Sequence, residues 1–112
     1  MIPLRGQVFF LDLGYGYGTH PYVIVSENRR NRSAKGDYLA VELTTTPLSP
    51  GREHLREMVV LRNSHPVIGV AKCGDIHTLE DRDLELYRGQ PGQIAAADMR
   101  AIDDGLRHAL GL

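Results

Sequence analysis

The stretch GTHPYVIVS, residues 18–26, decides the fold of this chain. Gly18 and Pro21 interrupt regular structure and mark a turn. The run Tyr22–Val25 then combines an aromatic ring with β-branched side chains, which predicts a strand apolar enough to lie at the centre of a sheet. His20 stands at the mouth of this strand, directly before the proline. It is either an ordinary loop residue or a group that takes up and releases a proton near neutral pH.

Four further strands are expected along the chain. Apolar and β-branched runs between Gly- and Pro-rich segments are typical of short antiparallel strands, and here they cover 6–13, 37–46, 56–63 and 67–76. Two stretches are predicted to be loops, the polar stretch 27–36 and the proline-containing stretch 47–54. Residues 79–87 are expected to form one helical turn and then a short strand.

In the last part of the chain the spacing of the apolar residues changes. Apolar residues recur at spacings of three and four, which predicts one face of a helix; they are Met99, Ile102, Leu106 and Leu110. Charged residues lie off that face: Asp98, Arg100, Asp103, Asp104 and Arg107. The sequence therefore predicts a mostly β fold, a small barrel or twisted antiparallel sheet, with a helix at its C-terminal end.

Length, charge and cysteine content exclude several classes of protein. The chain has 112 residues and a net charge of -1, so we expect one domain, 1–112, that is not a polycation. Cys73 is the only cysteine, which excludes a disulfide framework within one chain. No apolar run reaches the roughly 18 residues of a membrane span, and the first residues do not resemble a signal peptide. We therefore expect a cytoplasmic protein that does not enter a membrane.

Basic residues gather in two places on this nearly neutral chain. Four of the thirteen Lys and Arg residues fall within seven positions, and they are Arg29, Arg30, Arg32 and Lys35. Arg52 and His54 belong to a second group after Pro50. Such runs are usually solvated loops, but local positive charge also suits the phosphate backbone of a nucleic acid. Tyr15 and Tyr17, in a glycine-rich loop, are either turn residues or rings on which RNA bases stack.

Asp75 and His77 form a polar pair. They lie two residues apart on a predicted strand and therefore share a face of the sheet. A structural hydrogen bond is the simplest explanation of this spacing. No third ligand has the spacing of a metal site, so no metal and no cofactor is expected.

Five segments, in order along nearly the whole chain, resemble one family, the MazF/PemK (Kid-like) toxins of bacterial type II toxin–antitoxin systems. RGQVFFLDLG (5–14) is similar to the family's opening, and HPYVIVSENRRN (20–31) to its segment of Arg-Pro, an apolar run and a later Asn. VELTTT (41–46) occupies the place of a family segment whose last two residues are Thr and then either Ser or Thr. CGDIHTLE (73–80) is similar to an Asp-x-Ile/Val-Arg-Thr segment, and residues 92–112 to the closing glycine and helix.

This resemblance implies a small SH3-like β-barrel of the CcdB/PemK type. It also implies a metal-independent endoribonuclease that cleaves single-stranded RNA at selected sequences and so blocks translation. In that mechanism the RNA's own 2′-OH attacks the neighbouring phosphate. The implied partners are a second copy of the chain, giving a homodimer, and a cognate antitoxin whose extended acidic tail covers the RNA-binding groove.

The resemblance also implies site residues. The family's catalytic threonine matches Thr44, but His20 stands where the family has its catalytic arginine. Arginine stays charged and holds phosphate with a rigid fork, whereas histidine can transfer a proton. We therefore expect His20 and Thr44 to be catalytic. RNA binding is expected from Arg29, Asn31, Arg32, Lys35, Thr45, Arg52 and His54.

Two other functions are compatible with the same fold. CcdB-like gyrase poisons share this barrel and act by binding a protein, but their Trp-Gly-Ile ending is absent from this chain, which has no tryptophan. The second alternative is a catalytically inactive paralogue that only binds an antitoxin or RNA. Mapping RNA ends after induction distinguishes both from a nuclease.

Overall fold

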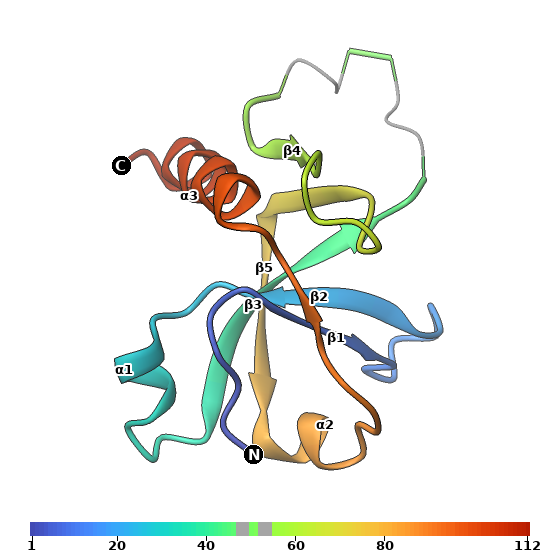
Figure 1. Ribbon diagram of the computed structural model, residues 1–112, viewed down its shortest axis with the longest axis vertical. Helices are drawn as coiled ribbons and strands as arrows, with labels where there is room; N and C mark the ends of the chain where they lie inside the picture. The colour runs from blue at the N-terminus through green and yellow to red at the C-terminus, as the bar shows by residue number, and fades with distance from the viewer. Residues whose placement is uncertain (47–49, 52–54) are drawn as a thin grey trace.

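The computed structural model describes residues 1–46, 50–51 and 55–112. These residues form one curled antiparallel sheet with three helices around it (Figure 1). The strands are β1 (Gln7–Leu11), β2 (His20–Ile24), β3 (Asp37–Thr44), β4 (Met58–Val60), β5 (Val70–Glu80) and β6 (Gly92–Gln93). The helices are α1 (Asn28–Asn31), α2 (Asp81–Glu85) and α3 (Ala96–Leu110). The predicted fold class, mostly β with a C-terminal helix, is confirmed.

The strands follow the spatial order β4-β5-β3-β2-β1-β6. β2 therefore has a neighbour on each side, as its apolar sequence predicts. Val23 pairs with Val8 of β1 and with Val41 of β3. These three β-branched side chains stand in one row across the sheet and are fully buried.

A bulge bends β5 in its middle. Val41 pairs with Ile76, but Leu43, two residues further along β3, pairs with Ala71, which is five residues earlier on β5. The extra residues of β5 therefore leave the ladder between these two pairs. A bulge of this kind turns a strand and aims side chains in a new direction. Here it presents Lys72 and Asp75 beside the start of β2.

The two faces of the sheet carry separate hydrophobic clusters. On one face Val23 and Leu43 pack with Met99 and Ile102 of α3. On the other face Ile24 packs in a cluster that includes Phe9, Leu79 and Leu84 of α2. Neighbouring residues of a strand point to opposite faces, so β2 contributes to both clusters at once. Figure 1 shows α3 and α2 at opposite ends of the molecule.

The predicted apolar face of helix α3 is buried only in part. Met99 and Ile102 are buried as expected, but Leu110 near the end of the helix is 57% exposed. Asp98, which the sequence placed off the apolar face, is buried. That prediction was wrong because the Asp98 carboxylate accepts hydrogen bonds from the 62–64 segment, which periodicity does not reveal.

Three local predictions also need correction. The stretch 27–36 is not only loop, because Asn28–Asn31 forms one helical turn. Residues 81–85 form the expected helical turn, but the short strand predicted to follow it is not found there. The strand β6 lies at 92–93 instead, paired with β1. β5 also continues to Glu80, four residues beyond its predicted end.

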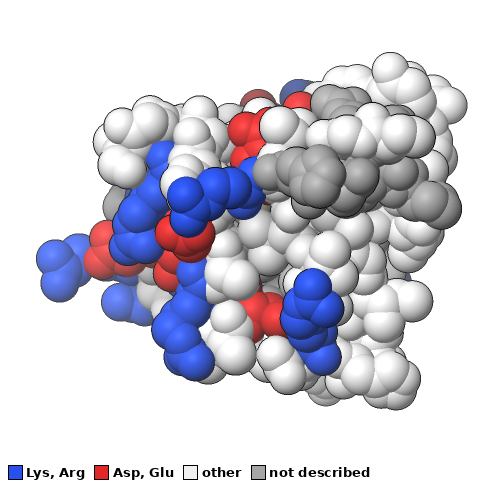
Figure 2. Space-filling view, turned by 90° about the horizontal axis from the view of Figure 1, so that it is seen from above, with Lys and Arg blue, Asp and Glu red and all other residues white. Residues whose placement is uncertain are grey.

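Charges of both signs cover much of the surface. Figure 2 shows blue and red side chains interspersed on the side where α3 lies, and a largely uncharged area on the other side of the same face. On α3 itself, Asp104 stands within ion-pair distance of both Arg56 and His108. None of the helices formed by the described residues has the length and apolar character needed to cross a membrane.

Candidate active site

A groove opens where the start of β2 meets the bulge of β5. It has a volume of about 710 Å³. We call it the His20 groove, and its lining residues are Tyr17, His20, Glu42, Lys72, Gly74, Asp75, Ile76 and His77. Five of these side chains can carry charge or move protons, and among the described grooves this one contains His20.

His20 is held by contacts to both of its ring nitrogens. Its Nδ1 lies 3.2 Å from Oε1 of Glu42, and its Nε2 lies 2.8 Å from the backbone oxygen of Tyr17. A carboxylate and a carbonyl oxygen only accept hydrogen bonds. The ring therefore makes both hydrogen bonds only when both nitrogens carry protons. In that form His20 is a cation and a proton donor.

A lysine places a second positive charge in the same groove. The ammonium group of Lys72 lies 3.0 Å from Oδ2 of Asp75 and 3.5 Å from Oε2 of Glu42. The hydrogen bond to Asp75 and the negative charge of Glu42 raise the pKa of Lys72, although partial burial opposes them. Lys72 is therefore charged at neutral pH, and Glu42 links it to His20.

His77 forms the opposite wall of the groove. Its ring packs against Tyr22 with a centroid distance of 5.3 Å and an angle of 74° between the ring planes. Burial and the nearby Glu42 carboxylate raise the pKa of Tyr22, so its hydroxyl stays neutral. The predicted pairing of Asp75 with His77 is not what the structure shows, because the ion partner of Asp75 is Lys72.

Thr44 lies at the end of β3, close to the start of β2. Tyr22 pairs with Glu42, and continuing that antiparallel register by two residues sets Thr44 opposite His20. The Thr44 hydroxyl accepts a hydrogen bond from the Thr46 amide at 3.1 Å. Thr45 is exposed. Thr44 thus stands at the rim of the His20 groove, and neither threonine belongs to the groove lining.

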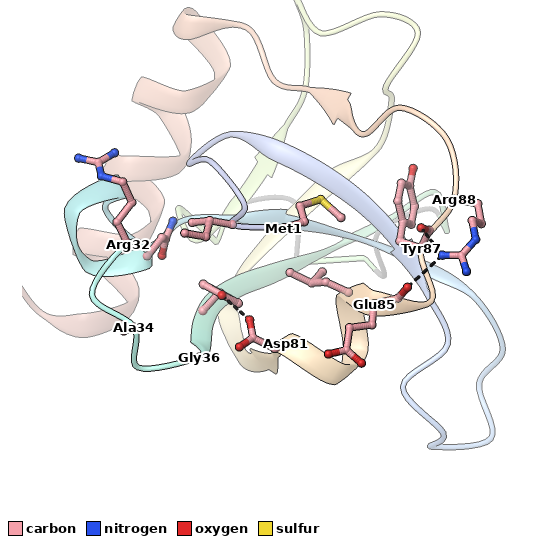
Figure 3. Close-up of a pocket in the computed structure, with 12 residues that line it drawn as sticks. Met1, Arg32, Ala34, Gly36, Asp81, Glu85, Tyr87 and Arg88 are labelled. Carbon is pink, nitrogen blue, oxygen red and sulfur yellow. Dashed lines mark hydrogen bonds between the residues drawn. The ribbon is translucent and has the colours of Figure 1, made fainter.

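The basic segment after β2 does not reach the His20 groove. Arg29 and Arg32 are exposed, and Arg30 forms an ion pair with Asp37 at 2.8 Å. Arg32 lines a different groove of about 780 Å³, at the opposite end from Tyr87 and Arg88 (Figure 3).

Lys35 lies in a third, shallow depression with Asp37, Glu80 and Arg82. The structure therefore separates these cations from His20. Arg52 and His54, which the sequence also assigned to RNA binding, lie outside the described residues.

Asn31 has a structural place. It is 2% exposed, and its side-chain amide donates hydrogen bonds to the backbone oxygens of Ser26 and Pro3. Ser26 in turn donates from its hydroxyl to the Asn31 side-chain oxygen. Both polar atoms of the amide are thus used inside the protein. Asn31 joins the N-terminal segment to the end of β2 instead of facing a ligand.

Sequence reasoning did not single out Glu42 and Lys72. Glu42 is one polar residue in an alternating strand, and Lys72 stands alone before Cys73. Their meeting depends on the bulge in β5, because the residues after Ala71 leave the ladder with β3 there and the Lys72 ammonium group comes within 3.5 Å of Glu42. No periodic signal in the sequence predicts that bulge.

The described residues contain no cluster of three or more His, Cys, Asp or Glu side chains able to hold a metal ion. The side chains that meet in the groove are instead imidazole, carboxylate and ammonium groups. Such groups transfer protons and stabilise negative charge.

The curled sheet is shared with a class of small bacterial toxins. A MazE–MazF complex from Deinococcus radiodurans superimposes with a TM-score of 0.74 over 100% of this chain and 98% of that chain, at 20% identity, which shows the fold alone. A family model described as the PemK-like, MazF-like toxin of type II toxin–antitoxin systems matches residues 4–110. The chain belongs to this family.

Closer relatives come from mycobacteria. Endoribonuclease MazF1 of Mycobacterium bovis is 41% identical over 110 residues, which is 98% of this chain and 94% of the relative. Endoribonuclease MazF4 of Mycobacterium tuberculosis matches to the same extent. A solved mycobacterial endoribonuclease in complex with its cognate antitoxin is 38% identical, with a TM-score of 0.81 over 98% of this chain and 96% of that one. These relatives bear out the family resemblance found in the sequence.

Proposed function

We propose that this protein is the toxin of a type II toxin–antitoxin system and acts as an endoribonuclease on single-stranded RNA. The observation that carries the proposal is the full-length similarity to relatives named endoribonucleases. The His20 groove supports it, since two imidazoles and an ammonium group line one open cavity. By arresting translation through cleavage of messenger RNA at a short motif, the protein would stop growth.

The proposed reaction is an internal transfer at phosphorus that uses no metal. The 2′-oxygen of the RNA forms a bond to the neighbouring phosphorus, and the bond from phosphorus to the 5′-oxygen breaks. The 2′-hydroxyl loses a proton, and the leaving 5′-oxygen gains one. His20 delivers a proton or offsets the developing negative charge, and Thr44 orients the phosphate from the rim.

The RNA strand extends beyond this groove. Arg29, Arg32, Lys35 and Thr45 are the proposed contacts for its flanking part, together with Arg52 and His54. Basic side chains outside a catalytic groove bind the phosphate backbone and fix the register of the strand. Asn31 is left out of this set because its amide is used inside the protein.

The proposed partners are a cognate antitoxin and a second copy of the chain. A solved relative is a complex with its cognate antitoxin. An acidic, extended antitoxin segment suits the exposed cations, and the contact would weaken with salt because charge pairing is screened. We further propose that residues 1–112 act as one domain and that the protein works in the cytoplasm, where messenger RNA is translated.

Brief induction in a bacterial host tests the proposal. Sequencing of RNA 5′ ends should show cleavage at one short motif, and purified protein should cleave the same motif in EDTA. Intact RNA together with gyrase-linked DNA breaks would instead establish the gyrase-poison function. Intact RNA and normal growth would favour the inactive paralogue.

A further inference from the structure

His77 is the second imidazole of the His20 groove, and the roles assigned so far do not use it. It projects from β5, whereas His20 projects from β2. His77 pairs with Ala40, and Ala40 pairs with Ile24 of β2. Residues paired across strands share a face, so His77, Ile24 and His20 point to the same side of the sheet.

Tyr22 stands between the two imidazoles. It lies on the same face of β2 as His20, two residues on, which is a separation of about 7 Å. The ring of His77 packs directly on Tyr22. His20 and His77 therefore flank the groove on either side of one buried aromatic ring.

The two imidazoles are held in different ways. His20 has an acceptor at each ring nitrogen, Glu42 at one and the Tyr17 carbonyl at the other. When both nitrogens carry protons, the ring donates to both acceptors. The ring of His77 is half-buried and fixed by packing on Tyr22, a contact that uses no hydrogen bond of the imidazole. An imidazole held by packing can keep a free lone pair and accept a proton.

We propose that His77 is the general base of the RNA cleavage, with His20 as the general acid; the inference rests on the proposed function. The attacking and leaving oxygens lie on opposite sides of phosphorus, so a base and an acid must stand on two sides of the bound phosphate. A ring nitrogen of His77 takes the proton of the 2′-hydroxyl as the 2′-oxygen bonds to phosphorus. The 5′-oxygen leaves with a proton from His20, giving a 2′,3′-cyclic phosphate and a 5′-hydroxyl.

Lys72 completes this division of tasks. It brings a positive charge to the same groove and pairs with Glu42, the carboxylate that also contacts His20. Negative charge grows on the phosphate oxygens during the transfer, and a nearby cation stabilises it. Neither imidazole then has to remain charged throughout the reaction.

The test uses two short RNAs that carry the mapped cleavage motif. One has the natural 5′-oxygen at the scissile bond and the other has sulfur there, because a thiolate leaves without a proton. Single-turnover rates are measured for the parent, His77→Phe, His77→Ala and His20→Ala. His77→Phe keeps a ring against Tyr22 but has no nitrogen, and His108→Gln on α3 is the matched control for removal of a histidine.

We expect His77→Phe to have the same melting temperature as the parent. It should cleave both RNAs about 10²- to 10⁴-fold more slowly than the parent, the usual effect of losing a proton-transfer group. Added imidazole should restore His77→Ala but not His77→Phe. His20→Ala should lose rate on the oxygen RNA and recover on the sulfur RNA. His108→Gln should match the parent.

Parent activity in His77→Phe would overturn the inference while the proposed function stands. A His77→Phe defect that disappears with the sulfur RNA would also overturn it, because His77 would then be the acid. A parent protein that cleaves neither RNA would overturn the proposed function itself, and the inference with it.

Discussion

The ring of His20 contacts two hydrogen-bond acceptors at once. Replacing His20 can distinguish two roles, which are proton transfer and stabilisation of negative charge. His20→Ala should lower the cleavage rate by roughly 10² to 10⁴ if the ring delivers a proton. His20→Arg restores a cation but not an imidazole that can transfer a proton. If His20 only offsets negative charge, His20→Arg should keep the parent rate, whereas a role in proton transfer predicts that this variant loses activity.

Thr44→Ala is the companion variant for this measurement. It should cost less activity than His20→Ala, because a hydroxyl at the rim orients the phosphate without exchanging its proton. Thermal unfolding should stay close to that of the parent for all three variants, since neither side chain is part of the core. Cleavage by His20→Ala at the parent rate would remove His20 from the mechanism.

At the scale of single elements, α3 depends on a glycine in its middle. A Cβ added at Gly105 would stand 2.7 Å from Cγ2 of Val59 and 2.9 Å from Sγ of Cys73. Helix propensity favours alanine over glycine by about 1 kcal/mol, but overpacking of this kind costs about 1–3 kcal/mol. Gly105→Ala should therefore lower the free energy of unfolding in urea.

Val59→Ala provides the control for this contact. Val59→Ala removes the methyl group that the Cβ of Gly105→Ala would meet. Made alone, Val59→Ala leaves a cavity. The double variant should lose less stability than the two single variants added together, because each change relieves the other. Simple additivity would show that Gly105 does not set the distance between α3 and β4.

The start of α3 is tied to the chain before β5 by a buried carboxylate. Asp98 accepts hydrogen bonds from the Ser64 hydroxyl and from the Asn63 and Arg62 amides. Burial alone would raise the pKa of Asp98, but these hydrogen bonds together outweigh it and lower the pKa. The segment 62–64 is thereby fixed to the helix.

This lowered pKa makes part of the stability depend on pH. The group stabilises the fold fully above its unfolded pKa of about 3.9, and the stabilisation is lost as pH falls through the lower folded pKa. Asp98→Asn should reduce the free energy of unfolding at pH 7 by about 1–3 kcal/mol. As pH falls below 5, the free energy of unfolding should also decrease less in the variant than in the parent. An equal slope with pH in both proteins would contradict the assignment.

At the scale of the whole molecule, we expect a homodimer that binds an acidic antitoxin segment. Val60, Ile68 and Leu110 leave large apolar side chains exposed, and β4 is the last strand of the sheet that the described residues form. Light scattering should give the mass of two chains at micromolar concentration. Affinity for the antitoxin segment should fall as salt rises. A strictly monomeric protein over that range would contradict the dimer.

The sequence predicts the strands and the C-terminal helix better than it predicts the residues of the His20 groove. Tyr22–Val25 and the spacing of Met99 and Ile102 reveal a strand and a helix because local periodicity reports a buried face. Asp98 was misplaced because its partners are about 35 residues away in the chain. His20 was found through its place before Pro21 at the mouth of a strand and then through its position in a family pattern. Lys72 could not be found in this way, because its meeting with Glu42 depends on the bulge of β5, which is set by pairing between distant strands.

The bulge of β5 also affects how this protein can diversify. Residues 72–75 lie between the ladder pairs at Ala71 and Ile76, so most of their backbone carries no partner strand on the β3 side. Cys73 is buried among them, but Asp75 is exposed and lines the groove. A lineage carrying this fold can therefore change the charge of the groove at Asp75 while the flanking ladder pairs and the core stay as they are.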